Sequence, residues 1–168
     1  MRIPLSILSL IALPLASDLH AKAVDAKGIL VDASGTAHGT VSLSVKDGMI
    51  HGTVRASGLQ PGQHGMHIHA VGQCTGEGFS GAGGHWNPDQ KQHGLQNPMG
   101  AHRGDLPQLT VARNGKVKAS FMLMSALSDL LDADGAALVI HANPDDGKTD
   151  PSGNSGARLL CAVITSGG

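Results

Sequence analysis

The sequence predicts an all-β domain, either a sandwich or a Greek-key barrel, that is interrupted by two long loops. Apolar and polar residues alternate in the short run 38–45, as they do in a strand with one buried face. The dipeptides Asp47-Gly48 and Asn114-Gly115 each follow such a run, and both are strong signals of a two-residue turn between antiparallel strands. Helical spacing of apolar residues is limited to a short turn within 125–131. Short strands joined by tight turns indicate an antiparallel β fold.

The predicted strands leave two long gaps along the chain. The strands at 38–45 and 49–56 are expected to form one hairpin, and those at 108–113 and 116–123 a second one. The gaps, about 72–106 and 142–157, are irregular, and long irregular connections inside a compact domain are usually functional. The expected strands cover 38–45, 49–56, 65–71, 108–113, 116–123, 136–141 and 158–164.

Residues 1–23 predict a cleaved export signal. Arg2 precedes an apolar run from Ile3 to Leu15, and Ala21-Lys22-Ala23 resembles a small-residue cleavage site. The run is shorter than the roughly 20 apolar residues that a transmembrane helix needs. An ordinary N-terminal strand or helix is the alternative.

Residues 24–168 are expected to form one domain with a net charge of −2 after loss of the signal segment. A chain of this length can bury a hydrophobic core of its own. The charge balance does not indicate nucleic acid or an anionic membrane as a partner. Because the sequence holds two phenylalanines, one tryptophan and no tyrosine, the core must consist mainly of Val, Leu, Ile, Met and Ala.

The sequence contains two cysteines, Cys74 and Cys161. In an exported protein an isolated pair most simply forms one disulfide. Two free thiols or two metal ligands are the alternatives at this point. A disulfide would close a large loop and contribute on the order of 4–5 kcal/mol in the chain-entropy model.

Six of the ten histidines form a pattern. His67 and His69 flank Ile68 in a predicted strand, so their side chains leave the same face and can converge on one metal ion. His141 ends another apolar strand, where it could equally be a core or capping residue. The remaining histidines outside the long loop stand alone and are expected to be surface or edge residues, namely His20, His38, His51 and His64.

The loop segment 83–107 carries the other three histidines of the pattern. His85, His93, His102 and Asp105 supply three nitrogens and one carboxylate, a set suited to tetrahedral zinc. A bound ion would order a glycine-rich segment that has few apolar side chains. Six histidines and one aspartate are one ligand short of two four-ligand sites, and sharing one histidine between two ions resolves the count.

The chain resembles the copper,zinc superoxide dismutases in their bacterial exported form, and the resemblance covers most of residues 28–164. It implies an eight-stranded Greek-key β-barrel. The matching segments are GMHIHAVGQC (65–74), GGHWNP (83–88), KQHG (91–94), GAHRGDLP (100–107), HANPDD (141–146) and GNSGARLLC (153–161).

The resemblance also implies a ligand set with one copper and one zinc ion per subunit. Copper would be held by His67, His69, His85 and His141, and zinc by His85, His93, His102 and Asp105, so that His85 is the bridge.

Other matching residues have implied roles around the two ions. Arg158 matches the arginine at the copper channel, and Cys74–Cys161 matches the disulfide that fastens the long loop to the barrel. Asp145 matches a carboxylate that hydrogen-bonds a ligand of each metal. Ser152 stands where many members have threonine at the channel rim, and it keeps the hydroxyl.

The implied activity is dismutation of superoxide to dioxygen and hydrogen peroxide in the periplasm. Copper would alternate between Cu(II) and Cu(I). The catalytic residues would be His85, which carries a proton, and Arg158, which steers the superoxide anion. The family uses different subunit interfaces, so the resemblance leaves both a monomer and a homodimer open. The alternatives are a non-catalytic exported copper/zinc-binding protein on the same barrel and a zinc hydrolase. The common H-x-H-x-D-H extension of zinc hydrolases is not matched, because Val71 and Gly72 occupy its last two places.

Overall fold

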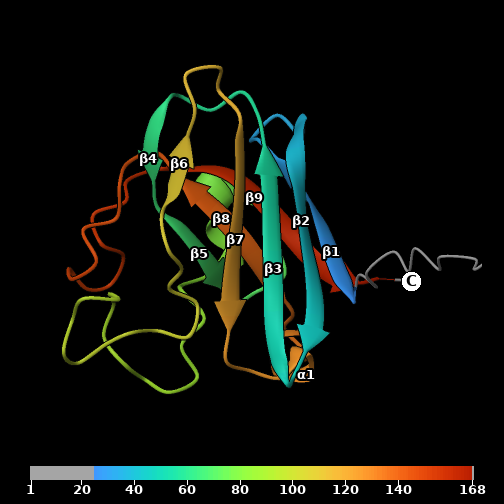
Figure 1. The fold of residues 1–168 in the computed structure, drawn as a ribbon, viewed down its shortest axis with the longest axis vertical. Helices are drawn as coiled ribbons and strands as arrows, with labels where there is room; N and C mark the ends of the chain where they lie inside the picture. Colours follow the sequence, from blue (N-terminus) through green and yellow to red (C-terminus); the bar gives the residue numbers. More distant parts are fainter. Residues whose placement is uncertain (1–24, 168) are drawn as a thin grey trace, which may run out of the picture.

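The computed structural model describes residues 25–167, and the predicted export signal over 1–23 lies outside them. Strands dominate the described chain, with one 3-10 turn and one short helix (Figure 1). Their bounds are β1 (Ala26–Val31), β2 (Ala37–Lys46), β3 (Met49–Ala56), β4 (Gly62–His64), β5 (Met66–His69), η1 (Glu77–Ala82), β6 (Leu109–Val111), β7 (Val117–Leu123), α1 (Leu127–Leu130), β8 (Ala136–His141) and β9 (Arg158–Ser166).

The strands form a curled antiparallel sheet. Seven strands pair in the order β5-β8-β9-β1-β2-β3-β7, and the short β4 pairs with β6. The chain passes from β4 to β5 through Gly65 alone and from β6 to β7 through a tight turn, so the short pair lies between the two edges of the large sheet. Counting β4 and β5 as one interrupted strand gives the predicted eight, and the predicted all-β barrel is confirmed.

The first predicted hairpin is confirmed, and the second one is wrong. β2 pairs with β3 over its whole length, and Asp47 and Gly48 between them both have positive φ, at 52° and 75°. The turn at Asn114-Gly115 is also present, but β6 pairs with β4 while β7 pairs with β3. Local turn chemistry sets the reversal of the chain. Which strand β6 and β7 each pair with depends instead on closing the barrel, because a free edge leaves backbone N–H and C=O groups unpaired.

The core is aliphatic, as the composition predicts. β3 and β7 alternate buried residues with more exposed ones, and all six residues of β8 are buried. In β2 the expected alternation stops after Leu43, because Ser44 is buried and Val45 is 46% exposed. Leu138 and Ile140 of β8 belong to the main core, and Ala137 and Val139 pack on its other face against Phe79 of the long loop. The loop between β5 and β6 therefore covers the outer face of β8.

A disulfide between Cys74 and Cys161 holds this loop against β9, with a Cα–Cα distance of 5.7 Å. Both cysteines are therefore accounted for, and neither is a free thiol or a metal ligand. Among residues 25–167, no helix has the length and apolar character that crossing a membrane requires. The predicted short turn within 125–131 is present as α1.

Candidate metal centre

Backbone pairing places the histidines of the long loop beside those of β5. Isolated bridges join His69 to His85 and His67 to Asp105, on the side of β5 opposite to β8. The Trp86 N–H donates to the Ile68 carbonyl at 2.8 Å, so the loop runs alongside β5 as an extra strand would. The position of the loop ligands is thus set by main-chain hydrogen bonds.

The first cluster consists of four histidines from β5, the loop and the end of β8: His67, His69, His85 and His141. Each offers one ring nitrogen, and these atoms lie within 4.8 Å of one another. Each of the four also has one buried ring nitrogen without a hydrogen-bond partner among the described residues, namely His67 Nδ1, His69 Nε2, His85 Nε2 and His141 Nε2. Buried unpaired polar atoms are costly and rare. Four of them in one cluster fit a metal ion.

The second cluster is centred on Asp105. Its Oδ1 lies 2.9 Å from His85 Nδ1, 3.0 Å from His93 Nδ1 and 3.2 Å from His102 Nδ1. Asp105 Oδ2 accepts hydrogen bonds from the backbone N–H groups of Gly94 and His102. Three imidazole nitrogens and one carboxylate oxygen at a single point are the donor set of a zinc site. His85 takes part in both clusters, through different ring nitrogens.

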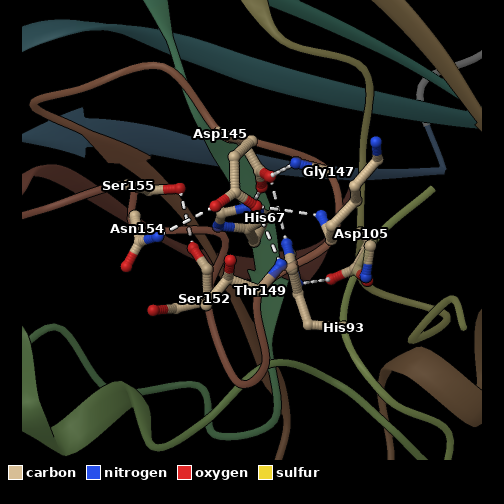
Figure 2. A network of polar contacts seen from close by, with 12 residues as sticks. His67, His93, Asp105, Asp145, Gly147, Thr149, Ser152, Asn154 and Ser155 are labelled. Carbon is tan, nitrogen blue, oxygen red and sulfur yellow. Dashed lines mark hydrogen bonds and ion pairs between the residues drawn. The ribbon is translucent and has the colours of Figure 1, made fainter. Parts of the chain in front are cut away.

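The Asp145 carboxylate connects the two clusters by contacting one histidine of each, His67 and His93 (Figure 2). One of its oxygens lies 2.5 Å from His67 Nε2, and the other lies 3.1 Å from His93 Nε2. The Gly147 N–H donates to the same carboxylate at 2.6 Å. Carboxylates in this position fix the orientation and tautomer of histidine ligands.

Burial lowers the pKa of three histidines of the first cluster. Burial lowers the pKa of His69 to about 2 and the pKa of His141 to about 3. Burial also lowers the pKa of His85 to about 4, against the opposing effect of its hydrogen bond to Asp105. These imidazoles are therefore neutral at pH 7, which is the protonation state that a metal ligand needs.

The two carboxylates remain ionised. Burial raises the pKa of Asp105, but hydrogen bonds from His85 and His93 more than offset this and hold it well below its usual range. The pKa of Asp145 is lowered in the same way by His67 and His93. Burial lowers the pKa of His93, but hydrogen bonds to both carboxylates raise it to about 9. His93 therefore holds its extra proton at pH 7, and a cation that binds at its Nδ1 must displace that proton.

Arg158 stands at a cavity of about 540 Å³ that opens onto both clusters. His69, His85, His102 and His141 line this cavity, and so does Ser152. The Arg158 guanidinium donates to the carbonyls of Phe79 and Gly83, at 2.8 Å each, and is therefore fixed in orientation. The Gly83 carbonyl also accepts from His69 Nδ1 at 2.9 Å, which couples the arginine to a member of the first cluster.

The structure thus brings together every site residue that the sequence predicts. Of the solitary histidines that the structure describes, His38 and His51 are partly exposed, but the expectation of a surface or edge position is wrong for His64; His20 lies outside the described residues. His64 is 3% exposed, and its two ring nitrogens lie 2.7 Å from the His141 carbonyl and 2.8 Å from the Gln60 carbonyl. It is buried because it ties the turn before β4 to the end of β8.

Gln108 is a positioning residue that sequence reasoning missed. Its side-chain amide makes two hydrogen bonds to the backbone of Asp145. It lies directly before β6 and 37 residues from its partner. A single glutamine in an irregular segment carries no signal of this role. The one available hint is its place three residues after Asp105.

A Greek-key barrel with two adjoining histidine clusters is the architecture of a class of proteins that can hold two metal ions. Residues 37–164 match the family described as copper/zinc superoxide dismutase (SODC). The chain therefore belongs to the copper/zinc superoxide dismutase family.

Individual relatives agree with this assignment. The chain is 36% identical to superoxide dismutase [Cu-Zn] 2 of Aquifex aeolicus over 94% of this chain and 93% of that one. It is 41% identical to the superoxide dismutase-like protein YojM of Bacillus subtilis over 80% of this chain and 73% of that one. The solved Cu/Zn superoxide dismutase from Brucella abortus superposes with a TM-score of 0.70 at 30% identity, over 84% of this chain and 100% of that one.

Proposed function

We propose that this protein is an exported superoxide dismutase that catalyses 2 O2•− + 2 H+ → O2 + H2O2. The observation that carries the proposal is the double use of His85. Its Nδ1 belongs to the Asp105 cluster, and its unpartnered Nε2 belongs to the cluster beside the cavity that Arg158 lines. One imidazole shared between two cation sites next to a fixed guanidinium is suited to redox chemistry on a small anion.

In this proposal the ligands are those that the sequence suggests. His67, His69, His85 and His141 hold copper, and the orphaned ring nitrogens of these four residues support the assignment. His85, His93, His102 and Asp105 hold zinc. When bound, copper supplies a one-electron couple, and all-imidazole ligation suits Cu(II). Zinc has no redox chemistry and orders the loop.

His85 supplies a proton to the product. Its Nδ1 is held at Asp105, so the proton can be exchanged only at Nε2. The residue lines the cavity, and when Nε2 is not engaged as a ligand it can hold a proton within reach of a small reduced species there. Peroxide needs two protons to leave as hydrogen peroxide, and His85 delivers one of them.

Arg158 binds and orients the substrate. Superoxide carries one negative charge, and a half-buried guanidinium at the cavity raises its local concentration. Two carbonyl acceptors hold two of the guanidinium nitrogens in place. The anion therefore meets a charge of fixed position, and little reorganisation is needed when it binds.

The Cys74–Cys161 disulfide supports the proposal of export to the periplasm, because disulfides persist in oxidising compartments. The proposed signal segment is 1–23 and the mature domain is 24–168. The homodimer stays a prediction.

The second candidate is a non-catalytic copper/zinc-binding protein, because one relative is named only superoxide dismutase-like. One experiment separates the two functions. Residues 24–168 are purified, loaded with copper and zinc, assayed for metal content, and mixed with superoxide in a stopped-flow spectrometer. The dismutase proposal expects one copper and one zinc per chain and rapid, second-order loss of superoxide. Full metal content without accelerated loss would favour the metal-binding protein.

A further inference from the structure

A second group of metal-ligating side chains lies on the outer face of β3 and β7, which run side by side in Figure 1. Met49 and His51 alternate with the buried residues of β3, so both point outward. Met122 points outward from β7 and pairs directly with His51 across the two strands. Met124 follows the last residue of β7, and the same register places it opposite Met49.

The two methionines at the end of β7 are unusually accessible. Met122 is 63% exposed and Met124 is 86% exposed. Three of the six methionines in the sequence thus gather at one corner of the barrel. Exposed apolar side chains that cluster have a cost in water and commonly mark a binding surface.

His51 adds a nitrogen donor to this corner. Its Nε2 is buried and has no hydrogen-bond partner among the described residues. A cavity of about 550 Å³ is lined by both His51 and Met122. A buried imidazole nitrogen without a partner beside a methionine side chain is an acceptor that a cation can satisfy.

The donor set selects the kind of cation. Thioether sulfurs are soft, uncharged ligands that favour Cu(I), and imidazole is compatible with it. The residues that pair with Met49 and His51 from β2 are Lys46 and Ser44, so no carboxylate comes from that strand. Directly opposed residues on antiparallel strands have Cβ atoms about 5 Å apart, and the flexible methionine side chain can close the remaining distance. Both cysteines are in the disulfide, so no thiol of the chain competes for the ion.

We propose that Met49, His51, Met122 and Met124 form a surface site for one Cu(I) ion, separate from the histidine centre. β3 and β7 contribute no residue to either histidine cluster. Binding at this corner is therefore independent of the ligands proposed for catalysis, and it goes beyond the proposed dismutase function.

The test uses protein whose histidine centre is already filled with zinc and reduced copper, which are both diamagnetic. Cu(I) is titrated under anaerobic conditions against a chromogenic Cu(I) chelator, while NMR follows methionine methyl groups labelled with ¹³C. We expect one further equivalent of Cu(I) and shifts of the Met49, Met122 and Met124 methyl signals. Met99, which is 64% exposed on the long loop, is the internal control and should not shift.

The matched variants are Met122→Leu/Met124→Leu and the control Met99→Leu. Leucine keeps the volume of methionine and removes the sulfur, so folding is preserved. The double variant should lose the further equivalent or bind it at least tenfold more weakly, whereas the control should retain it. The proposal is overturned if no further equivalent binds, if the double variant keeps it at full affinity, or if Met99 shifts equally. Superoxide turnover is measured on the same samples, so a failure of the dismutase proposal would be seen separately.

Discussion

Gln108 and Asp145 are joined by two hydrogen bonds between a side-chain amide and a backbone peptide. Gln108 Nε2 donates to the Asp145 carbonyl at 2.7 Å, and the Asp145 N–H donates to Gln108 Oε1 at 3.1 Å. Backbone hydrogen bonds such as that from Asn143 to Ser155 join the two arms of the loop 142–157 to each other, whereas this pairing joins the loop to the segment before β6. The Asp145 carboxylate is thereby held between His67 and His93, one from each cluster.

Replacing Gln108 by alanine should weaken metal binding without removing a ligand. The backbone of Asp145 would lose both partners, and the carboxylate would orient His93 less well. Losing the carboxylate itself typically costs about 10–100-fold in metal affinity, so losing its Gln108 support should cost about tenfold or less. Competition of the purified protein with a zinc chelator measures the effect. Gln63→Ala, at an exposed position on β4, is the matched control, and equal affinities in the two variants would refute the role of Gln108.

Replacing His85 by alanine should damage both metal sites, whereas His69→Ala should affect copper alone. His85 contacts Asp105 through Nδ1, while His69 has no contact with Asp105 and lies in the first cluster only. Metal content after dialysis, measured by mass spectrometry for copper and zinc separately, distinguishes the two patterns. Unchanged zinc affinity in the His85 variant would mean that this residue is not the bridge.

Reducing the Cys74–Cys161 disulfide should lower the melting temperature. The bond closes a loop between residues 87 positions apart. In the chain-entropy model this is worth on the order of 4 kcal/mol, or about 10 °C in a domain of this size. Calorimetry of the protein with and without reductant, and of Cys74→Ser/Cys161→Ser, measures it. Reduction should also speed the release of metal from the long loop. An unchanged melting curve with free thiols present would contradict the predicted loss of stability.

Reversing the charge of Arg158 should slow turnover and leave the metal content near normal. Arg158 contacts two carbonyls and lines the cavity, but it is not a proposed ligand. Arg158→Glu should lower the second-order rate constant by roughly tenfold or more, because the steering of the anion is lost. Arg158→Lys keeps the charge and should be milder. Added salt should slow the native protein more than the glutamate variant, and equal rates at low salt in all three would exclude substrate guidance.

The surface pair of His38 and Asp32 should give a small pH-dependent contribution to stability. His38 Nε2 lies 2.9 Å from Asp32 Oδ2, and this hydrogen bond, with a second one to the Ser57 carbonyl, raises the pKa of His38 above its usual 6.5. The folded state therefore binds the proton more tightly than the unfolded state does. The stabilisation is complete below pH 6.5 and is lost as the pH rises through the raised pKa.

NMR titration of the His38 ring measures this pKa directly. In Asp32→Asn it should return toward 6.5, because the largest cause of the shift is removed. Thr36→Ala is the control, since it keeps the Asp32 carboxylate and the backbone N–H that donates to it. An unchanged His38 pKa in the Asp32 variant would contradict the assignment.

The sequence by itself determined the features that depend on neighbouring residues. Alternation over 38–45 and the Asp47-Gly48 turn predicted the β2–β3 hairpin, because a strand face and a tight turn are local properties. Strand β1 was missed because Gly28 is buried and the apolar Ile29 is 62% exposed, so apolar and polar residues do not alternate along it. The types and spacings of the histidines and Asp105 suggested two metal sites that share a ligand, because few other functions require that set of donor atoms.

Only the tertiary structure decided which distant residues meet. The partner of β6 is β4 rather than β7, because strand pairing depends on closing the barrel and not on the turn. His64 is buried because the His141 carbonyl, at the end of β8, meets one of its ring nitrogens across 77 residues. Gln108 reaches Asp145 across 37 residues, and Met122 faces His51 across 71 residues, through the register of two strands. Hydrogen bonds and packing between such positions form after the chain has folded back on itself, so their partners cannot be deduced from composition or spacing along the chain.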